Sequence, residues 1–303
     1  MPPIDVAALI RSYADLHIVP LPFDFDGLCI DLKVPGRRPK VIVNSTRSDE
    51  RVRFTLAHEL GHLLIPWHVG SIVDRTAMER AEEDYDYWFL EAEANRFASE
   101  LLMPSAWVSE IAAACDSPLE ALSRVRVEAR TSKQAATLKL IQCMPPNYVM
   151  AQTIDGIIVT SQSSPGTAAD VPPKGSLLGS DPYPYATGRW RTSNYYWWSL
   201  AVRDAPVPRD AAGVWRQVLD QILEDCGVTD AEEKRALKAS INGIVASVNN
   251  PTRRGSAGAI YAAGLQRLYA RATDDPRIAA LLKHPLRDEF LALRIAEFVA
   301  RTS

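Results

Sequence analysis

The sequence predicts an α+β protein, because its β-prone runs occur in local pairs while much of the remaining chain has helical periodicity. Two such pairs lie near residues 28–43 and 148–162, each with turn residues between its members. Apolar residues at helical spacing recur between these pairs and again after about residue 209. We therefore expect a small β hairpin or sheet with helices, then a small β region, then a helical C-terminal domain.

The expected elements of the first half have recognisable start and stop signals. They are a helix over 4–15, a hairpin of Leu28–Val34 and Lys40–Val43 around a Pro-Gly turn, a helix capped by Ser or Thr that ends at Pro66, a helix from about Met78 to Leu102, and two short helices between Pro118 and Gln142 around "RTS". The last pair belongs to a small subdomain at 105–145 that resembles a helix-turn-helix.

The second half begins with two strands, "YVMAQTI" and "GIIVTS", around the tight turn Asp155-Gly156. Residues 163–188 are rich in Pro, Gly and Ser, which indicates a linker or long loop. "RWRTSNYYWWSLAV" is aromatic and strand-like, and Thr229 to Glu232 fits a capping box at the start of a helix. The expected domains are 1–145, 146–205 and 206–303.

Composition argues for a cytoplasmic protein without a general attraction to nucleic acid. The net charge is −3, and 23% of the residues are charged. The four cysteines lie far apart, so we expect buried thiols rather than a disulfide framework. The N-terminal segment has acidic residues within its apolar part, which is unlike a signal peptide, and no apolar run is long enough to span a membrane.

The segment "RFTLAHELGHLLIPWH" predicts a metal site. His58 and His62 are four residues apart on a predicted helix, so both imidazoles share one face and can reach one ion. Glu59 beside them completes the HExxH pattern, in which two histidines bind zinc and the glutamate is the general base. Apolar residues occupy nearly every side of this helix, and polar side chains in a core helix need partners. We therefore favour a metal site over two hydrogen-bonded histidines.

A catalytic zinc ion needs a third protein ligand, and the sequence offers two candidates. His68 has the metzincin spacing, but Ile65 stands where that pattern has a glycine. Glu91 lies in "EAEANRFASELLMP", where Asn95 four residues later shares its helix face and can hold a ligand histidine. Glu93 is a rival on another face of the same helix. We favour Glu91.

The sequence resembles the ImmA/IrrE family of metallo-endopeptidases in two segments, "VIVNSTRSDERVRFTLAHELGHLL" and "EAEANRFASELLMP". The resemblance covers roughly residues 1–145. It implies a gluzincin-like zinc protease domain with one Zn²⁺ per chain. The implied ligands are His58, His62 and Glu91, and the implied base is Glu59.

The same resemblance implies a substrate class. Better-known members of the family cut helix-turn-helix repressors and so release gene expression after stress or during mobile-element transfer. For this chain the target would be a separate protein. The alternative is a DNA-binding or repressor-binding regulatory module with a structural zinc ion and no proteolysis.

Substrate contacts are predicted only from proximity in the sequence. His68, Tyr85 and Tyr87 are candidates for a second oxyanion donor or a substrate contact. The strand Lys40–Val43 is a candidate edge that pairs with an extended peptide.

Two further patterns have both a structural and a functional interpretation. Five cations in the helix-turn-helix-like segment suit phosphate contacts: Arg124, Arg126, Arg130, Lys133 and Lys139. We favour a helical subdomain packed on the protease over direct DNA binding, because the whole chain is acidic. For the aromatic run "WRTSNYYWWS" we favour a buried strand over a ligand-stacking surface.

Overall fold

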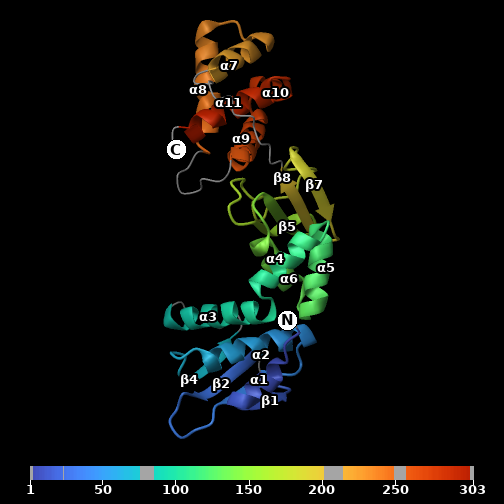
Figure 1. Ribbon diagram of the computed structural model, residues 1–303, viewed down its shortest axis with the longest axis vertical. Coiled ribbons are helices and arrows are strands. Elements are labelled where there is room, and N and C mark those ends of the chain that lie inside the picture. The colour runs from blue at the N-terminus through green and yellow to red at the C-terminus, as the bar shows by residue number, and fades with distance from the viewer. Residues whose placement is uncertain (1–2, 23, 76–84, 201–213, 249–256, 301–303) are drawn as a thin grey trace. The chain divides into compact units, whose positions relative to one another are not determined.

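The chain forms two units in the computed structural model, Met1–Cys143 and Met144–Ser303. The structure describes residues 3–22, 24–75, 85–200, 214–248 and 257–300. Both units contain helices and a sheet, which confirms the mixed α+β class (Figure 1). The finer division into three domains stays a prediction. None of the described helices is long and apolar enough to cross a membrane.

A four-stranded sheet lies at one side of the first unit, with the strand order β1-β3-β2-β4. The predicted hairpin is confirmed, because β2 (Phe25–Leu32) pairs antiparallel with β3 (Lys40–Asn44). Two unpredicted strands flank it: β1 (Asp15–Val19) runs parallel to β3, and β4 (Gly70–Arg75) runs antiparallel to β2.

This strand order corrects the hypothesis about a substrate edge. Both sides of β3 are hydrogen-bonded to neighbouring strands, so Lys40–Val43 lies inside the sheet and offers no free edge. The edges of the described sheet are β1 and β4. A peptide that extends this sheet therefore has to pair with one of those strands.

Two long helices cross the sheet region and hold the predicted metal-site residues. Helix α2 (Asp49–Leu64) begins at Ser48, whose side chain accepts a hydrogen bond from the backbone of Arg51, and it is buried from Thr55 to Leu63. Helix α3 (Tyr85–Leu102) runs beside it (Figure 1). The start predicted for this second helix, at Met78, lies outside the described residues. The short helix α1 (Val6–Tyr13) packs on α2 and agrees with the prediction for 4–15.

An ion-pair network fixes the start of α2 to the sheet. The Asp26 side chain in β2 is only 5% exposed and accepts hydrogen bonds from Nε of Arg47 and Nε of Arg51, each at 2.7 Å. Two cations around one buried carboxylate offset the cost of removing it from water. This network holds the first turn of α2 against β2.

Three shorter helices complete the first unit: α4 (Ser105–Ala114), α5 (Pro118–Ala129) and α6 (Lys133–Cys143). The predicted pair of helices around "RTS" is confirmed. Arg130 ends α5 in the left-handed conformation, with φ of 52°, so the chain reverses within three residues.

The second unit begins with an antiparallel sheet of order β6-β5-β8-β7. The predicted hairpin is β5 (Tyr148–Ile154) and β6 (Ile157–Ser163), and both residues of its turn have positive φ, 50° at Asp155 and 80° at Gly156. The aromatic run forms a second hairpin, β7 (Ala186–Arg191) and β8 (Tyr195–Leu200). Trp197 and Trp198 are fully buried, which confirms the core interpretation.

The segment between the two hairpins is a packed loop and no linker. Ala169 and Tyr183 enter the core beside Trp198, and the Tyr183 hydroxyl donates to the backbone carbonyl of Asp170 at 2.7 Å. The composition of the segment indicated a loop, but the burial of these two side chains could be seen only in the tertiary structure.

The described residues after β8 form five helices: α7 (Val214–Asp225), α8 (Ala231–Ala246), α9 (Ala257–Ala272), α10 (Pro276–Lys283) and α11 (Arg287–Ala300). Their buried faces form one apolar core. The cap of α8 differs from the prediction. Asp230, rather than Thr229, accepts hydrogen bonds from the backbone N–H groups of Glu232 and Glu233.

The cap of α8 gives a direct test by substitution. We expect Asp230→Ala to lower the free energy of unfolding of this unit by about 1 kcal/mol, because two backbone donors lose their acceptor. Thr229→Ala is the matched control and should change little. Chemical denaturation of both variants measures the difference, and equal losses would contradict the assignment of the cap.

Candidate metal centre

Three ligand atoms from α2 and α3 converge inside the first unit. Nε2 of His58 lies 2.9 Å from Nε2 of His62, and the Glu91 carboxylate faces both rings at 3.2 and 3.3 Å. One ligand atom from each residue lies within 4.8 Å of the others. The helix repeat places the two imidazoles one turn apart, and the neighbouring helix supplies the acid.

Glycine 61 allows the two helices to come this close. A Cβ atom added there would lie 3.2 Å from the Cα of Ala94 and 3.2 Å from the ring of Phe97 on α3. An alanine there would require its neighbours to give by a few tenths of an ångström, and a larger side chain would require more. The glycine inside HELGH therefore determines how near Glu91 comes to the histidines.

The cluster is buried, and its electrostatics fit a cation. His58, His62 and Glu91 are 2%, 1% and 7% exposed. Burial alone raises the pKa of Glu91, but the two adjacent imidazoles outweigh this and lower that pKa to about 2. Burial also lowers the pKa of His62, which favours the neutral ring that binds metals.

One buried oxygen supports this interpretation. Oε1 of Glu91 accepts no hydrogen bond of normal geometry from the described residues, although it lies beside Nε2 of His62. A buried carboxylate oxygen without a donor is costly unless a cation satisfies it. Two imidazole nitrogens and one carboxylate are also the donor set of many catalytic zinc sites. The residues present therefore fit a divalent metal ion.

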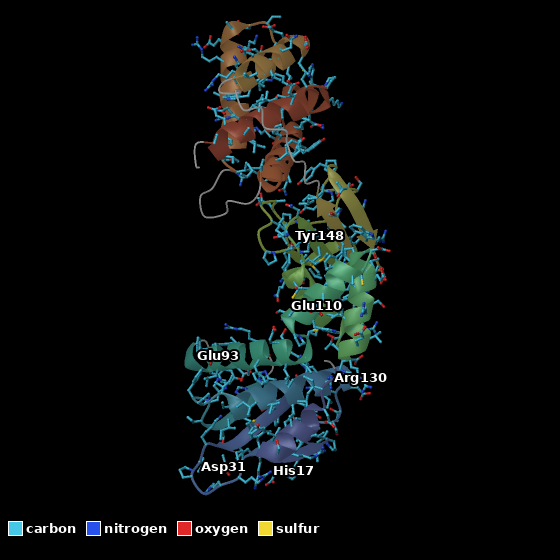
Figure 2. All side chains as sticks on the ribbon, in the orientation of Figure 1. His17, Asp31, Glu93, Glu110, Arg130 and Tyr148 are labelled. Carbon is cyan, nitrogen blue, oxygen red and sulfur yellow. The ribbon has the colours of Figure 1, made fainter. Side chains whose placement is uncertain are left out.

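The outer nitrogens of both histidines have partners. Nδ1 of His58 lies 3.1 Å from Oδ1 of Asn95, where the sequence predicted such a contact. Nδ1 of His62 lies 2.7 Å from Nδ1 of His68, and Nε2 of His68 lies 3.2 Å from Oε2 of Glu93. Figure 2 labels Glu93 on α3.

His68 lies behind His62, and its contact with substrate stays a prediction. It is fully buried, and it contacts the nitrogen of His62 that faces away from Glu91. Its two ring nitrogens contact Nδ1 of His62 and Oε2 of Glu93. Burial lowers its pKa. The link from His62 through His68 to Glu93 had no signal in the sequence, because it depends on the path of the chain after Ile65.

Glu59 lies buried beside the cluster and against the sheet. The Cys29 thiol of β2 donates a hydrogen bond to Oε2 of Glu59 at 2.9 Å. Burial, and next the nearby Glu59 charge, raise the pKa of Cys29 well above its ordinary value, so this thiol stays protonated and can donate. Gly27 leaves room for the carboxylate, since a Cβ there would lie 2.5 Å from Oε1 of Glu59. The sequence did not point to either residue.

The two predicted tyrosines are less well defined. Tyr87 is half-buried near the start of α3, with its ring centroid 6.0 Å from that of Trp88. The side chain of Tyr85 lies outside the described residues. A contact of either residue with substrate stays a prediction.

A cavity of about 560 Å³ adjoins the cluster on the side of Asn95. Helices α2, α3 and α6 line it, and its wall combines apolar and uncharged polar side chains with the charged residues Glu50, Arg51 and Lys139. Phe54, Asn95, Ser99 and Leu138 are part of this wall. Asn95, which contacts the outer nitrogen of His58, connects this cavity to the ligand cluster, while the three ligands themselves do not line it.

A comparison with protein families agrees with this geometry. Residues 14–140 match the Peptidase_M78 family, described as the IrrE N-terminal-like domain. This part of the chain is therefore similar to Peptidase_M78 domains. The resemblance to ImmA/IrrE proteins is thereby confirmed, and the Peptidase_M78 domain carries every residue of the cluster. The match ends before the second unit, and no curated protein matches the chain.

The packing of Gly27 against Glu59 in the Peptidase_M78 domain can be tested by substitution. We expect Gly27→Ala to lower the free energy of unfolding by about 1–3 kcal/mol, because the new methyl group overlaps the Glu59 carboxylate and the Thr55 methyl group. Gly179→Ala is the control, since nothing lies within 4 Å of its added Cβ. Denaturation curves and a crystal structure of the variant measure the effect. An unchanged stability with Glu59 in place would contradict it.

Proposed function

We propose that this chain is a zinc-dependent endopeptidase in which His58, His62 and Glu91 hold one ion and Glu59 is the general base. The observation that carries the proposal is the convergence of two Nε2 atoms and a carboxylate around one point, next to a buried glutamate on the same helix. With an acid from the second helix as third ligand, the site is of the gluzincin type. Three protein ligands leave the open coordination position that catalytic zinc sites have.

Each residue then has a defined task. The bound ion supplies Lewis acidity to water and to the peptide carbonyl. Glu59 accepts a proton from the attacking water and returns it to the departing amine, while the Cys29 thiol holds one of its carboxylate oxygens in place. Asn95 orients the ring of His58 through its outer nitrogen.

The proposed substrate is a helix-turn-helix transcriptional repressor whose cleavage relieves repression during stress or mobile-element transfer. The similarity of residues 14–140 to an IrrE-like domain supports this class. We further propose that the cavity beside Asn95 receives side chains of the substrate next to the scissile bond. Phe54 and Leu138 in its wall favour an apolar substrate residue there.

A DNA-binding or repressor-binding module with a structural zinc ion is the alternative, and the site supports it less well. Structural zinc sites are typically closed by four cysteine or histidine ligands, whereas this cluster has three ligands and includes a carboxylate. Two of the five cations expected to face DNA also have acidic partners. Arg124 pairs with Glu128, and the buried Lys139 pairs with Glu100 at 2.6 Å.

The decisive variant is Glu59→Gln. We expect it to keep zinc and the fold while proteolysis falls by roughly 10²–10⁴-fold, because Gln cannot accept the proton. Purified, zinc-loaded protein is incubated with repressors encoded near its gene, and fragments are mapped by mass spectrometry, with bound zinc measured in parallel. Glu110→Gln, an exposed acid on α4, is the control (Figure 2). Cleavage that survives Glu59→Gln would refute Glu59 as the general base of the proposed site, and unchanged regulation without cleavage would favour the binding module.

The role of the cavity is tested by filling it. We expect Ser99→Trp to raise KM or to reduce kcat/KM at least about tenfold, because the indole takes the space proposed for a substrate side chain. Zinc affinity should stay unchanged. Ser240→Trp on the exposed surface of α8 is the control. Normal cleavage kinetics of Ser99→Trp would place the substrate elsewhere.

A further inference from the structure

We propose that His68 and Glu93 form a positioning relay that fixes the ring orientation and the tautomer of His62, so that Nε2 of His62 carries a free lone pair for the ion. This inference rests on the proposed metal site, but it concerns two residues that bind no metal themselves. It gives a role to the third histidine of the HELGHLLIPWH segment.

The path of the chain after α2 brings His68 behind His62. The helix ends at Leu64, Ile65 is extended with ψ of 119°, and the backbone N–H of His68 donates to the carbonyl of Ile65 at 3.3 Å. This turn folds His68 back into the interior, where it is 0% exposed. A buried imidazole with both nitrogens 2.7 and 3.2 Å from polar partners is held in one orientation.

The proton positions in the contacts between His62, His68 and Glu93 can be assigned by starting from Glu93. The Glu93 carboxylate only accepts, so Nε2 of His68 carries the proton between them. A neutral imidazole has one N–H, which leaves Nδ1 of His68 as an acceptor. Nδ1 of His62 therefore donates to it, and Nε2 of His62 has no proton.

The neighbouring ligand has a parallel arrangement. Oδ1 of Asn95 accepts a hydrogen bond from Nδ1 of His58, which makes Nε2 of His58 an unprotonated lone pair as well. The two Nε2 atoms lie 2.9 Å apart and both face the Glu91 carboxylate, so in this tautomer their lone pairs converge where the ion would bind. The two ligand rings thus reach the same tautomer through different partners.

Glu93 is itself held in place by a second donor. The indole N–H of Trp67 donates to Oε2 of Glu93 at 2.7 Å, and this is the same oxygen that His68 contacts. The Glu93 side chain is 18% exposed, so it is part of the boundary between the relay and solvent. Glu91 and Glu93 on one helix thus serve different ends of the His62 ring: Glu91 faces Nε2, and Glu93 acts on Nδ1 through His68.

The test compares two replacements of His68. Gln offers an oxygen that accepts from Nδ1 of His62 and an amide that donates to Glu93, whereas Leu offers neither. We expect His68→Leu to weaken zinc binding by roughly 10–100-fold, and His68→Gln to recover most of that loss. Competition with a chromogenic chelator at fixed pH measures the affinity of the full chain. Wild-type affinity in His68→Leu would overturn the relay.

A spectroscopic measurement on the metal-free protein separates positioning from general destabilisation. Long-range ¹H–¹⁵N correlation spectra of ¹⁵N-histidine-labelled protein report which ring nitrogen carries the proton. We expect His62 to be protonated on Nδ1 in the wild type and in His68→Gln, and to shift toward the other tautomer in His68→Leu. A His62 ring that keeps its Nδ1 proton in His68→Leu would overturn the inference.

A second variant covers the case in which His68→Leu does not fold. Glu93→Leu removes the acceptor at the more exposed end of the relay, and we expect it to weaken zinc binding and to disturb the His62 tautomer in the same direction. Glu100→Gln, on the same helix but paired with Lys139, is the control and should do neither. If Glu93→Leu left both the zinc affinity and the tautomer of His62 unchanged, the relay would be contradicted. A wild type that binds zinc tightly but cuts no peptide would refute the protease and leave the relay intact.

Discussion

The close approach of α2 and α3 is the constraint on which the candidate metal centre depends. A Cβ atom added to Gly61 would lie 3.2 Å from the Cα atom of Ala94. The two helices therefore meet closely in the region where His58, His62 and Glu91 face one another. A side chain at this position would have to be accommodated by a shift of Ala94 or Phe97 on α3, because packed interiors leave little free space. The ion site is therefore a consequence of one small residue in a helix contact as much as of its ligands.

Part of this arrangement could be read from the sequence, and the limits have physical causes. The spacing of His58 and His62 is set by the helix repeat, so their common face follows from local structure alone. The choice between His68 and Glu91 depends on the turn after Ile65 and on the contact between two helices, and local spacing left it open. The contacts of Cys29 and Gly27 with Glu59 join a strand to a helix some thirty residues later, which no local pattern encodes.

The difference between local and long-range interactions also explains which predictions of the fold were wrong. Hairpins were predictable because their partners are neighbours and their turns have marked residues, as at Asp155-Gly156. Strand β1 was missed because its residues are mostly exposed and show no alternation of burial, and its partner β3 is parallel and distant in sequence. That pairing encloses Lys40–Val43, which had been expected at an edge. The predicted N-cap of α8, Thr229, is one residue away from the observed N-cap, Asp230. Helix boundaries are commonly uncertain by one or two residues.

The charges around the centre link metal binding to the stability of the first unit. Glu91 and Glu93 both have lowered pKa values, Glu91 because adjacent imidazoles outweigh its burial and Glu93 because Trp67 and His68 donate to it. Both are therefore ionised at neutral pH, and Glu91 is buried beside the two imidazole rings. A buried anion in that position is costly, and a divalent ion removes the cost. Since only the folded chain assembles the three ligands, an ion at a thousand times its dissociation constant stabilises the fold by about 4 kcal/mol. The polar centre thus weakens the metal-free core and strengthens the metal-bound one.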